Sequence, residues 1–141
     1  MLTGFGGYVP LSALMKTVFS SPEAPPALGP YSQAVGAGSF VFCSGQVPLQ
    51  VATGELVSED VAEQTKQALL NLEAVLKSAG LSYANIVKTT VFLTDLSRFA
   101  DMNAVYAKFF PDAPPARSTI EVSGLPRGAK VEIEAIAVKP S

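Results

Sequence analysis

Apolar and polar positions along the chain follow two different periods. Between residues 61 and 79 the apolar side chains recur every three to four positions, which predicts an amphipathic helix. Ser58 is the expected N-terminal cap of this helix, and Gly80 is its expected stop. Residues 96–110 show the same period and predict a second helix, which is closed by Pro111.

Other segments alternate or are rich in β-branched residues, as strands are. Residues 31–45 predict a hairpin that turns at Gly36 to Gly38, and residues 85–96 predict the strongest strand. Residues 116–125 and 130–138 predict two further strands. The element order β-β-α-β-α-β-β predicts a single α+β domain without internal repeats.

The predicted strands are apolar on both faces, although two helices can cover only one face of such a sheet. The last strand shows the pattern most clearly, because Val131, Ile133, Ala135 and Ala137 alternate with Glu132, Glu134, Ile136 and Val138. An uncovered apolar face marks an interaction surface, so we expect a homo-oligomer whose sheets pack on each other. The alternative is that the proline-rich loop of residues 20–30 folds over this face.

The composition excludes several classes of function. The 141 residues carry a net charge of −2 and no run of Lys or Arg, so the chain lacks the footprint of a nucleic-acid-binding protein. Histidine is absent and Cys43 is the single cysteine, which excludes a disulfide within the chain, a cysteine-rich metal site and Ser-His or Cys-His catalysis. We expect no metal and no cofactor, and we assign Cys43 to the core.

Two features of the sequence bear on the location of the protein: its apolar runs and its N-terminal residues. No apolar run approaches the roughly 18 residues of a membrane span. The first fourteen residues contain no Lys or Arg, so they lack the charged region of a signal peptide, and Met15 reads as an alternative start. We treat residues 1–15 as an N-terminal extension, native or not, and residues 16–141 as the domain, with a cytoplasmic location as the default expectation.

Arg117 and Glu132 are the leading candidates for chemistry. An arginine within a strand is expensive to desolvate unless an anion meets it. From spacing alone, an ion pair between Arg117 and Glu132 on neighbouring strands is the simpler interpretation, and a substrate anion is the alternative. Tyr31, the Ser44–Gly45 pair and Asn103 are weaker candidates, because packing, a turn and solvation account equally well for them.

Six motifs then occur in order between residues 16 and 139: APPALGPYSQAV, VFCSGQVP, IVKTTVFLTDL, FADMNAVYAKFF, PPARSTIEVSGLP and KVEIEAIAV. In these motifs the chain resembles the YjgF/Rid family of reactive-intermediate deaminases, whose older name is L-PSP endoribonuclease or translation inhibitor. The resemblance implies a fold similar to chorismate mutase of the Bacillus type. It also implies a homotrimer with sheets at the centre, helices outside and sites in clefts between subunits.

The resemblance also implies roles for individual residues by their motif positions. Arg117 would clamp a substrate carboxylate, and Glu132 would position water and move protons. The substrate-binding residues would be Tyr31, Ser44, Gly45, Asn103, Arg117 and Thr119. Many relatives have cysteine where this chain has Thr119, which matters little if the contact is made by the backbone N–H.

The implied activity is that of a 2-iminobutanoate/2-iminopropanoate deaminase. Its substrates are small 2-imino or 2-enamino acids released by pyridoxal-phosphate enzymes, and its products are 2-keto acids and ammonia. An iminium carbon is already electrophilic, so water can attack it without a metal or a histidine. Two alternatives remain: an endoribonuclease or translation inhibitor, which the missing histidines and basic patch disfavour, and a non-catalytic module that binds small carboxylates.

Overall fold

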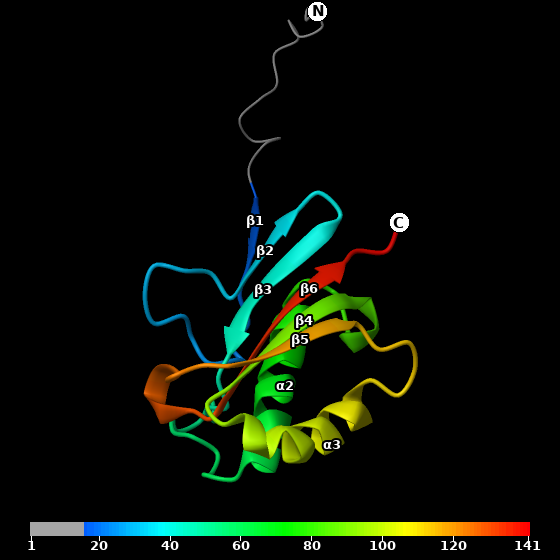
Figure 1. The fold of residues 1–141 in the computed structure, drawn as a ribbon. Helices are drawn as coiled ribbons and strands as arrows, with labels where there is room; N and C mark the ends of the chain where they lie inside the picture. The colour runs from blue at the N-terminus through cyan, green and yellow to red at the C-terminus, as the bar shows by residue number, and fades with distance from the viewer. Residues whose placement is uncertain (1–15) are drawn as a thin grey trace, which may run out of the picture.

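Two helices lie on one face of a six-stranded sheet in the computed structural model, which describes residues 16–141 (Figure 1). The expected extension, residues 1–15, falls outside the described residues. Neither helix of the described part is long and apolar enough to cross a membrane. The elements in chain order are β1 (Thr17–Phe19), β2 (Ala34–Ala37), β3 (Phe40–Gln46), α2 (Val61–Ser78), β4 (Ile86–Leu93), α3 (Phe99–Phe109), β5 (Ala116–Glu121) and β6 (Val131–Val138).

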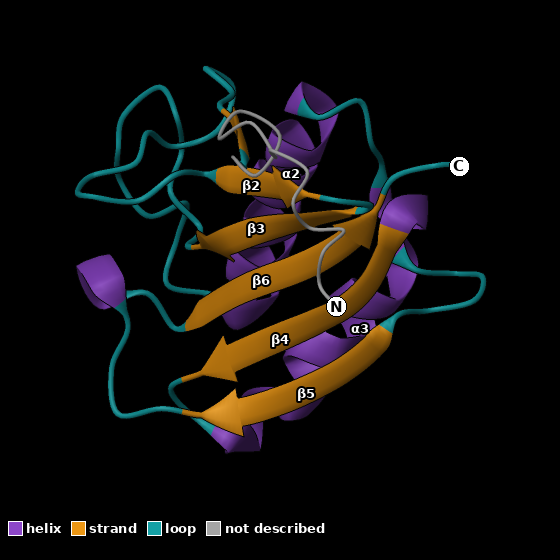
Figure 2. Cartoon of the chain, turned by 90° about the horizontal axis from the view of Figure 1, so that it is seen from above, coloured by secondary structure: helices purple, strands orange, loops and turns teal. Residues whose placement is uncertain are grey.

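The strands are arranged in the order β1-β2-β3-β6-β4-β5 (Figure 2). Every neighbouring pair is antiparallel except β4 and β5, which are parallel. The element order is therefore the predicted one with a single addition, the short edge strand β1. The sequence gives little sign of β1, because three residues are too few to show a period, and its pairing with β2 defines it.

The helix ends differ slightly from their expected positions. The N-cap of α2 is Asp60, whose side chain accepts a hydrogen bond from the backbone N–H of Glu63 at 2.9 Å, so the prediction of Ser58 as the cap is wrong. Ser58, two residues before the cap, instead accepts a hydrogen bond from the backbone N–H of Asp60. Gly80 follows α2 with a φ of 75°, which confirms the predicted stop. Helix α3 begins at Phe99, since a separate 3₁₀ turn precedes it.

The first hairpin turns later than the sequence suggested. Gly36 lies inside β2 and pairs with Val41, so it is a strand residue and not part of the turn. The turn itself consists of Gly38 and Ser39, between the paired residues Ala37 and Phe40. Gly38 has a φ of 58°, which glycine adopts without strain.

The core fills the space between the helices and the sheet. One set of alternating β6 residues, predicted from the sequence to share a face, is 0–4% exposed and joins the apolar stripe of α2 in one buried cluster. This confirms the alternation in β6 and the period of α2. Burying Val131 and Ile133 stabilises the fold by about 1.5–3 kcal/mol each, which orients β6 with one face toward the helices. The β6 members are Val131, Ile133, Ala135 and Ala137.

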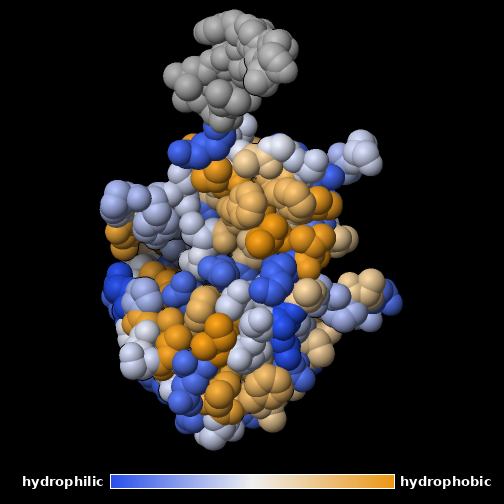
Figure 3. All heavy atoms as spheres, turned by 45° about the horizontal axis from the view of Figure 1, so that its top comes forward, coloured by the Kyte–Doolittle hydropathy of each residue, from blue (hydrophilic) through white to orange (hydrophobic). Residues whose placement is uncertain are grey.

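The opposite face of the sheet carries apolar side chains that no described segment covers. Phe40, Phe42 and Ile120 are 44–46% exposed, and Val18 is 57% exposed. Figure 3 shows hydrophobic side chains gathered over part of this side of the molecule, with hydrophilic ones between them. Within the described residues the proline-rich loop therefore leaves these side chains uncovered, and we call this surface the open face.

Candidate functional site

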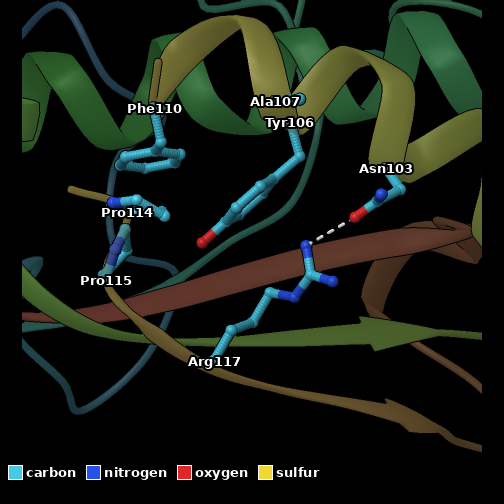
Figure 4. Close-up of a pocket in the computed structure, with 7 residues that line it drawn as sticks. All are labelled: Asn103, Tyr106, Ala107, Phe110, Pro114, Pro115 and Arg117. Carbon is cyan, nitrogen blue, oxygen red and sulfur yellow. Dashed lines mark hydrogen bonds between the residues drawn. The ribbon is translucent and has the colours of Figure 1, made fainter. Parts of the chain in front are cut away.

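Arg117 on β5 points toward the helices. It pairs in register with Thr89 of β4, which is fully buried on the helix-covered face. The Nη1 of Arg117 donates a hydrogen bond to the Oδ1 of Asn103 at 2.8 Å. Its guanidinium carbon lies 4.7 Å from the ring centroid of Tyr106 and 5.4 Å from that of Phe99, within the range of cation–π contacts. Figure 4 shows the side chain reaching from the sheet toward α3.

A cavity of about 400 Å³ opens beside this guanidinium. Apart from the arginine and one amide, aromatic rings, prolines and an alanine line the cavity (Figure 4). Within residues 16–141 no carboxylate lies within 4.0 Å of Arg117, and its recorded hydrogen bond uses one nitrogen. The remaining N–H groups can donate hydrogen bonds to a planar anion, for which a guanidinium fork is well shaped. We call this region the arginine pocket; its lining residues are Asn103, Tyr106, Ala107, Phe110, Pro114, Pro115 and Arg117.

Thr119 lies two residues beyond Arg117 on the same face of β5. It pairs with Val91, a fully buried residue of β4. The Oγ1 of Thr119 is buried and has no hydrogen-bond partner within the described residues. Buried polar atoms without partners are rare in native proteins, so this hydroxyl marks a second polar position beside the arginine pocket.

Glu132 lies on the open face. Its chain neighbours Val131 and Ile133 point into the core, and successive strand residues point to opposite faces. Its carboxylate is half-buried, and burial raises the pKa of the Glu132 side chain, with a smaller increase from the negative charge of Glu134. A raised pKa makes the Glu132 carboxylate a better proton acceptor than an ordinary exposed one.

Gly45 gives Glu132 the room that it occupies. A Cβ added to Gly45 would lie 2.8 Å from the Cδ of Glu132 and 3.0 Å from its Cγ, and closer still to Oε2. Contacts of this length are too short, so any larger residue at position 45 would displace the carboxylate. Glycine is needed here for close approach and not for an unusual backbone conformation, because position 45 has no positive φ.

Two hydrogen bonds hold the residues that follow Tyr31 against the same end of β3. The Oγ of Ser44 donates to the carbonyl of Ser32 at 2.6 Å, and the N–H of Ser44 donates to the carbonyl of Gln33 at 2.9 Å. Tyr31 is 53% exposed and, with Gly45, lines a cavity of about 310 Å³. The structure therefore brings four of the candidate residues into one group, which we call the glutamate cluster: Tyr31, Ser44, Gly45 and Glu132.

The arginine pocket and the glutamate cluster occupy opposite faces of the sheet. The ion pair expected between Arg117 and Glu132 is therefore wrong for this chain, for two reasons. Strand β4 lies between β5 and β6, and the two side chains leave the sheet in opposite directions. The short connection between β5 and β6 suggested neighbouring strands, whereas β5 instead pairs in parallel with β4.

Asn103 and Tyr106 have roles that the sequence pattern did not reveal. Asn103, expected at a ligand site or in solvent, directs its amide oxygen to Arg117. Phe99 and Tyr106 fall on the apolar side of the helix predicted for residues 96–110, yet their rings contact the guanidinium. The spacing of Phe99, Asn103 and Tyr106 indicates that they lie together, because positions i, i+4 and i+7 share one helix face.

Cys43 is a core residue, as predicted. It is 5% exposed, and burial raises the pKa of its thiol to about 11. The thiolate, which is the nucleophilic form, is therefore scarce at neutral pH. Among the described residues no group of His, Cys, Asp or Glu side chains is arranged to hold a metal ion.

Comparisons with known proteins agree with this architecture. The sequence model of the Endoribonuclease L-PSP family matches residues 21–139. Protein DfrA of Myxococcus xanthus is 52% identical over 127 residues, which cover 89% of this chain and 97% of that protein. A Mus musculus protein named 2-iminobutanoate/2-iminopropanoate deaminase is 47% identical over 129 residues, covering 92% of this chain and 96% of that protein.

The solved structures include close matches as well. The crystal structure of E. coli TdcF with bound serine superposes with a TM-score of 0.84 at 46% identity. The match covers 88% of this chain and 99% of that one. The chain therefore belongs to the Endoribonuclease L-PSP family, which is the YjgF/Rid family that its motifs indicated.

Proposed function

We propose that the protein is an imine deaminase that hydrolyses small 2-imino and 2-enamino acids, such as 2-iminobutanoate and 2-iminopropanoate, to 2-keto acids and ammonia. The observation that carries this proposal is the guanidinium of Arg117, which faces a cavity without a carboxylate partner in the described residues. The name of the Mus musculus relative and the serine bound to E. coli TdcF support a small amino-acid-like ligand.

Arg117 would bind the carboxylate of the substrate. Two parallel N–H···O bonds fix both the position and the plane of a carboxylate, which brings the neighbouring C2 atom to a defined place. The apolar remainder of the arginine pocket would exclude water from this ion pair and strengthen it.

Glu132 would carry out the proton transfers. Its carboxylate accepts a proton from water as the water oxygen forms a bond to the electrophilic C2 atom, which gives a carbinolamine. The same proton then passes from Glu132 to the amine nitrogen. The C–N bond breaks with its electron pair on nitrogen and ammonia leaves, while the hydroxyl oxygen forms the C=O bond of the 2-keto acid and gives its proton back to Glu132. The raised pKa of Glu132 suits both steps, since the group must accept and donate a proton at similar pH.

The two groups act on one substrate only if a second copy of the chain is present, because they lie on opposite faces of one sheet. We therefore propose a homotrimer in which the arginine pocket of one subunit meets the glutamate cluster of the next. The uncovered apolar side chains of the open face support such an assembly. Light scattering gives the subunit number directly, and a monomer at micromolar concentration would contradict it.

Mixing two inactive variants tests the shared site. Arg117→Ala and Glu132→Gln, refolded together in equal amounts, should regain about a quarter of the wild-type activity, because about a quarter of the interfaces then pair two intact groups. If both groups served a site within one chain, the mixture would stay inactive.

Arg117→Ala tests the carboxylate clamp itself. Loss of a bidentate, charge-assisted pair should weaken productive binding by about 10²–10⁴-fold, at about 1.4 kcal/mol per decade. Arg117→Lys should recover little, because an ammonium cannot form two parallel bonds. The assay supplies the imine from a threonine dehydratase and follows ammonia release, with particle mass and melting temperature as controls.

Other outcomes of this assay would replace the proposal. A wild-type protein that binds 2-oxobutanoate but does not accelerate imine hydrolysis would be a carboxylate-binding module. RNA cleavage that persists in Arg117→Ala would favour a nuclease. The arginine pocket would then have no role in catalysis.

A further inference from the structure

One face of α3 is directed at a single guanidinium. Phe99, Asn103 and Tyr106 occupy positions i, i+4 and i+7, and all three contact Arg117. The amide oxygen of Asn103 accepts a hydrogen bond from Nη1, whereas the guanidinium carbon lies over the two rings, 4.7 Å from the centroid of Tyr106 and 5.4 Å from that of Phe99. An arginine on an edge strand would otherwise keep much of its rotational freedom.

Tyr106 is itself held at both ends. Its hydroxyl shares a hydrogen bond of 2.7 Å with the Oγ1 of Thr89, a residue that is fully buried and lies beside Arg117 in the sheet. Its ring lies 4.7 Å from that of Phe110, centroid to centroid. Phe110 in turn contacts the ring of Tyr83 at 5.7 Å. The ring that faces the guanidinium is therefore anchored in the core, as Figure 4 shows for Tyr106 and Phe110.

We infer that Tyr106 is a positioning residue for substrate binding: its anchored ring holds the plane of the Arg117 guanidinium so that the unpaired N–H groups face the cavity. This inference rests on the proposed role of Arg117 as the carboxylate clamp. A guanidinium ordered before binding loses little freedom when the carboxylate arrives, so the anchor increases affinity.

A positioning role and a purely structural role predict different kinetics. If Tyr106 acts through Arg117, its loss removes binding that the ground state and the transition state share, so KM rises and kcat stays nearly constant. If Tyr106 only fills the core, its loss lowers the melting temperature and leaves KM unchanged.

The experiment compares Tyr106→Leu and Tyr106→Phe with the matched control Tyr83→Leu. Tyr83 is also a tyrosine whose hydroxyl is bonded, here to the carbonyl of Leu69, and whose ring contacts Phe110, but it does not touch Arg117. The probe is 2-oxobutanoate, measured by titration calorimetry, with imine hydrolysis measured in parallel on the same samples.

Tyr106→Leu should raise both the Kd for 2-oxobutanoate and the KM by about 5- to 30-fold while kcat changes by less than about twofold. Tyr106→Phe keeps the ring and should restore affinity to within about threefold of the wild type. Tyr83→Leu should lower the melting temperature without changing Kd. An unchanged Kd in Tyr106→Leu, or an equal rise in Tyr83→Leu, would overturn the inference.

The outcomes separate this inference from the proposed function. If Arg117→Ala leaves the Kd unchanged, the clamp and the positioning role both fail. If the Kd values follow the expected order but no imine is hydrolysed, the deaminase proposal fails and the positioning role stands. If Tyr106→Leu does not fold, Tyr106→Met removes the ring with a more flexible side chain instead, and an unchanged Kd in that variant overturns the inference.

Discussion

Replacing Gly45 by alanine tests whether the place of the Glu132 carboxylate controls turnover. The added methyl group would lie 2.8 Å from the Cδ of Glu132, on a side chain that can move. To reach ordinary van der Waals distance the carboxyl carbon must retreat by roughly 0.6 Å, and its nearer oxygen by more; a misplacement of about 1 Å can cost 10²-fold in rate. We therefore expect kcat to fall by about 10²-fold.

Binding and stability should change far less in this variant. Gly45→Ala leaves the Arg117 clamp itself unaltered, so KM for the imine and the Kd for 2-oxobutanoate should stay within about threefold. Gly124→Ala is the matched control, because a Cβ there meets nothing within 4 Å. The coupled imine assay measures both variants.

A double variant locates the cause of the loss. If Gly45→Ala acts by displacing Glu132, it should add no further loss in a Glu132→Ala background. A Gly45→Ala protein with wild-type turnover, or a full additional loss in the double variant, would refute this reasoning.

Three further predictions follow from the burial of single side chains. Burial and the charge of Glu134 both raise the pKa of Glu132, and Glu132 must be ionised to accept the proton from water, so kcat/KM should fall as the pH drops through this raised pKa. Glu134→Gln removes the smaller cause and should move this acidic limb of the pH profile to lower pH. A limb that moves to higher pH would contradict the assignment. Cys43→Ser should keep the deaminase rate within about tenfold, since the buried thiol is scarcely ionised, and a loss of several decades in folded protein would make Cys43 a catalytic candidate. Ile136→Asp puts a charge among the apolar side chains of the open face and should disperse the assembly in light scattering, whereas an unchanged mass would place the interface elsewhere.

Local periodicity predicted the elements well because each element buries one face. The helix at 61–79 and the alternation in β6 are confirmed for this reason. Local periodicity does not predict strand order, because strand order depends on which segments pair after a long connection. The position of β4 between β5 and β6 could not be read from either strand alone, and it separated Arg117 from Glu132.

In the candidate site, too, local motifs identify the residues, whereas the pairing of distant strands decides how these residues are arranged. The sequence motifs named Arg117 and Glu132, but the face to which each side chain points follows from the register of the sheet. The period of residues 96–110 puts Tyr106 on the apolar side of the predicted helix, and the structure buries it in the core cluster. Its hydroxyl bonds to Thr89, and its ring also lies 4.7 Å from the guanidinium carbon of Arg117, a contact that the helical period alone did not indicate.

The central place of β6 has a consequence for how the chain folds during synthesis. Residues 131–138 lie between β3 and β4, so the emerging chain has two separate pieces of sheet until these residues have left the ribosome. The β1–β3 piece and the β4–β5 piece each expose an unpaired strand edge during that interval, and such edges are templates for pairing with other chains. Nascent chains stalled before residue 131 should therefore be bound by chaperones and remain sensitive to protease, and release of the last strand should close the sheet in one step.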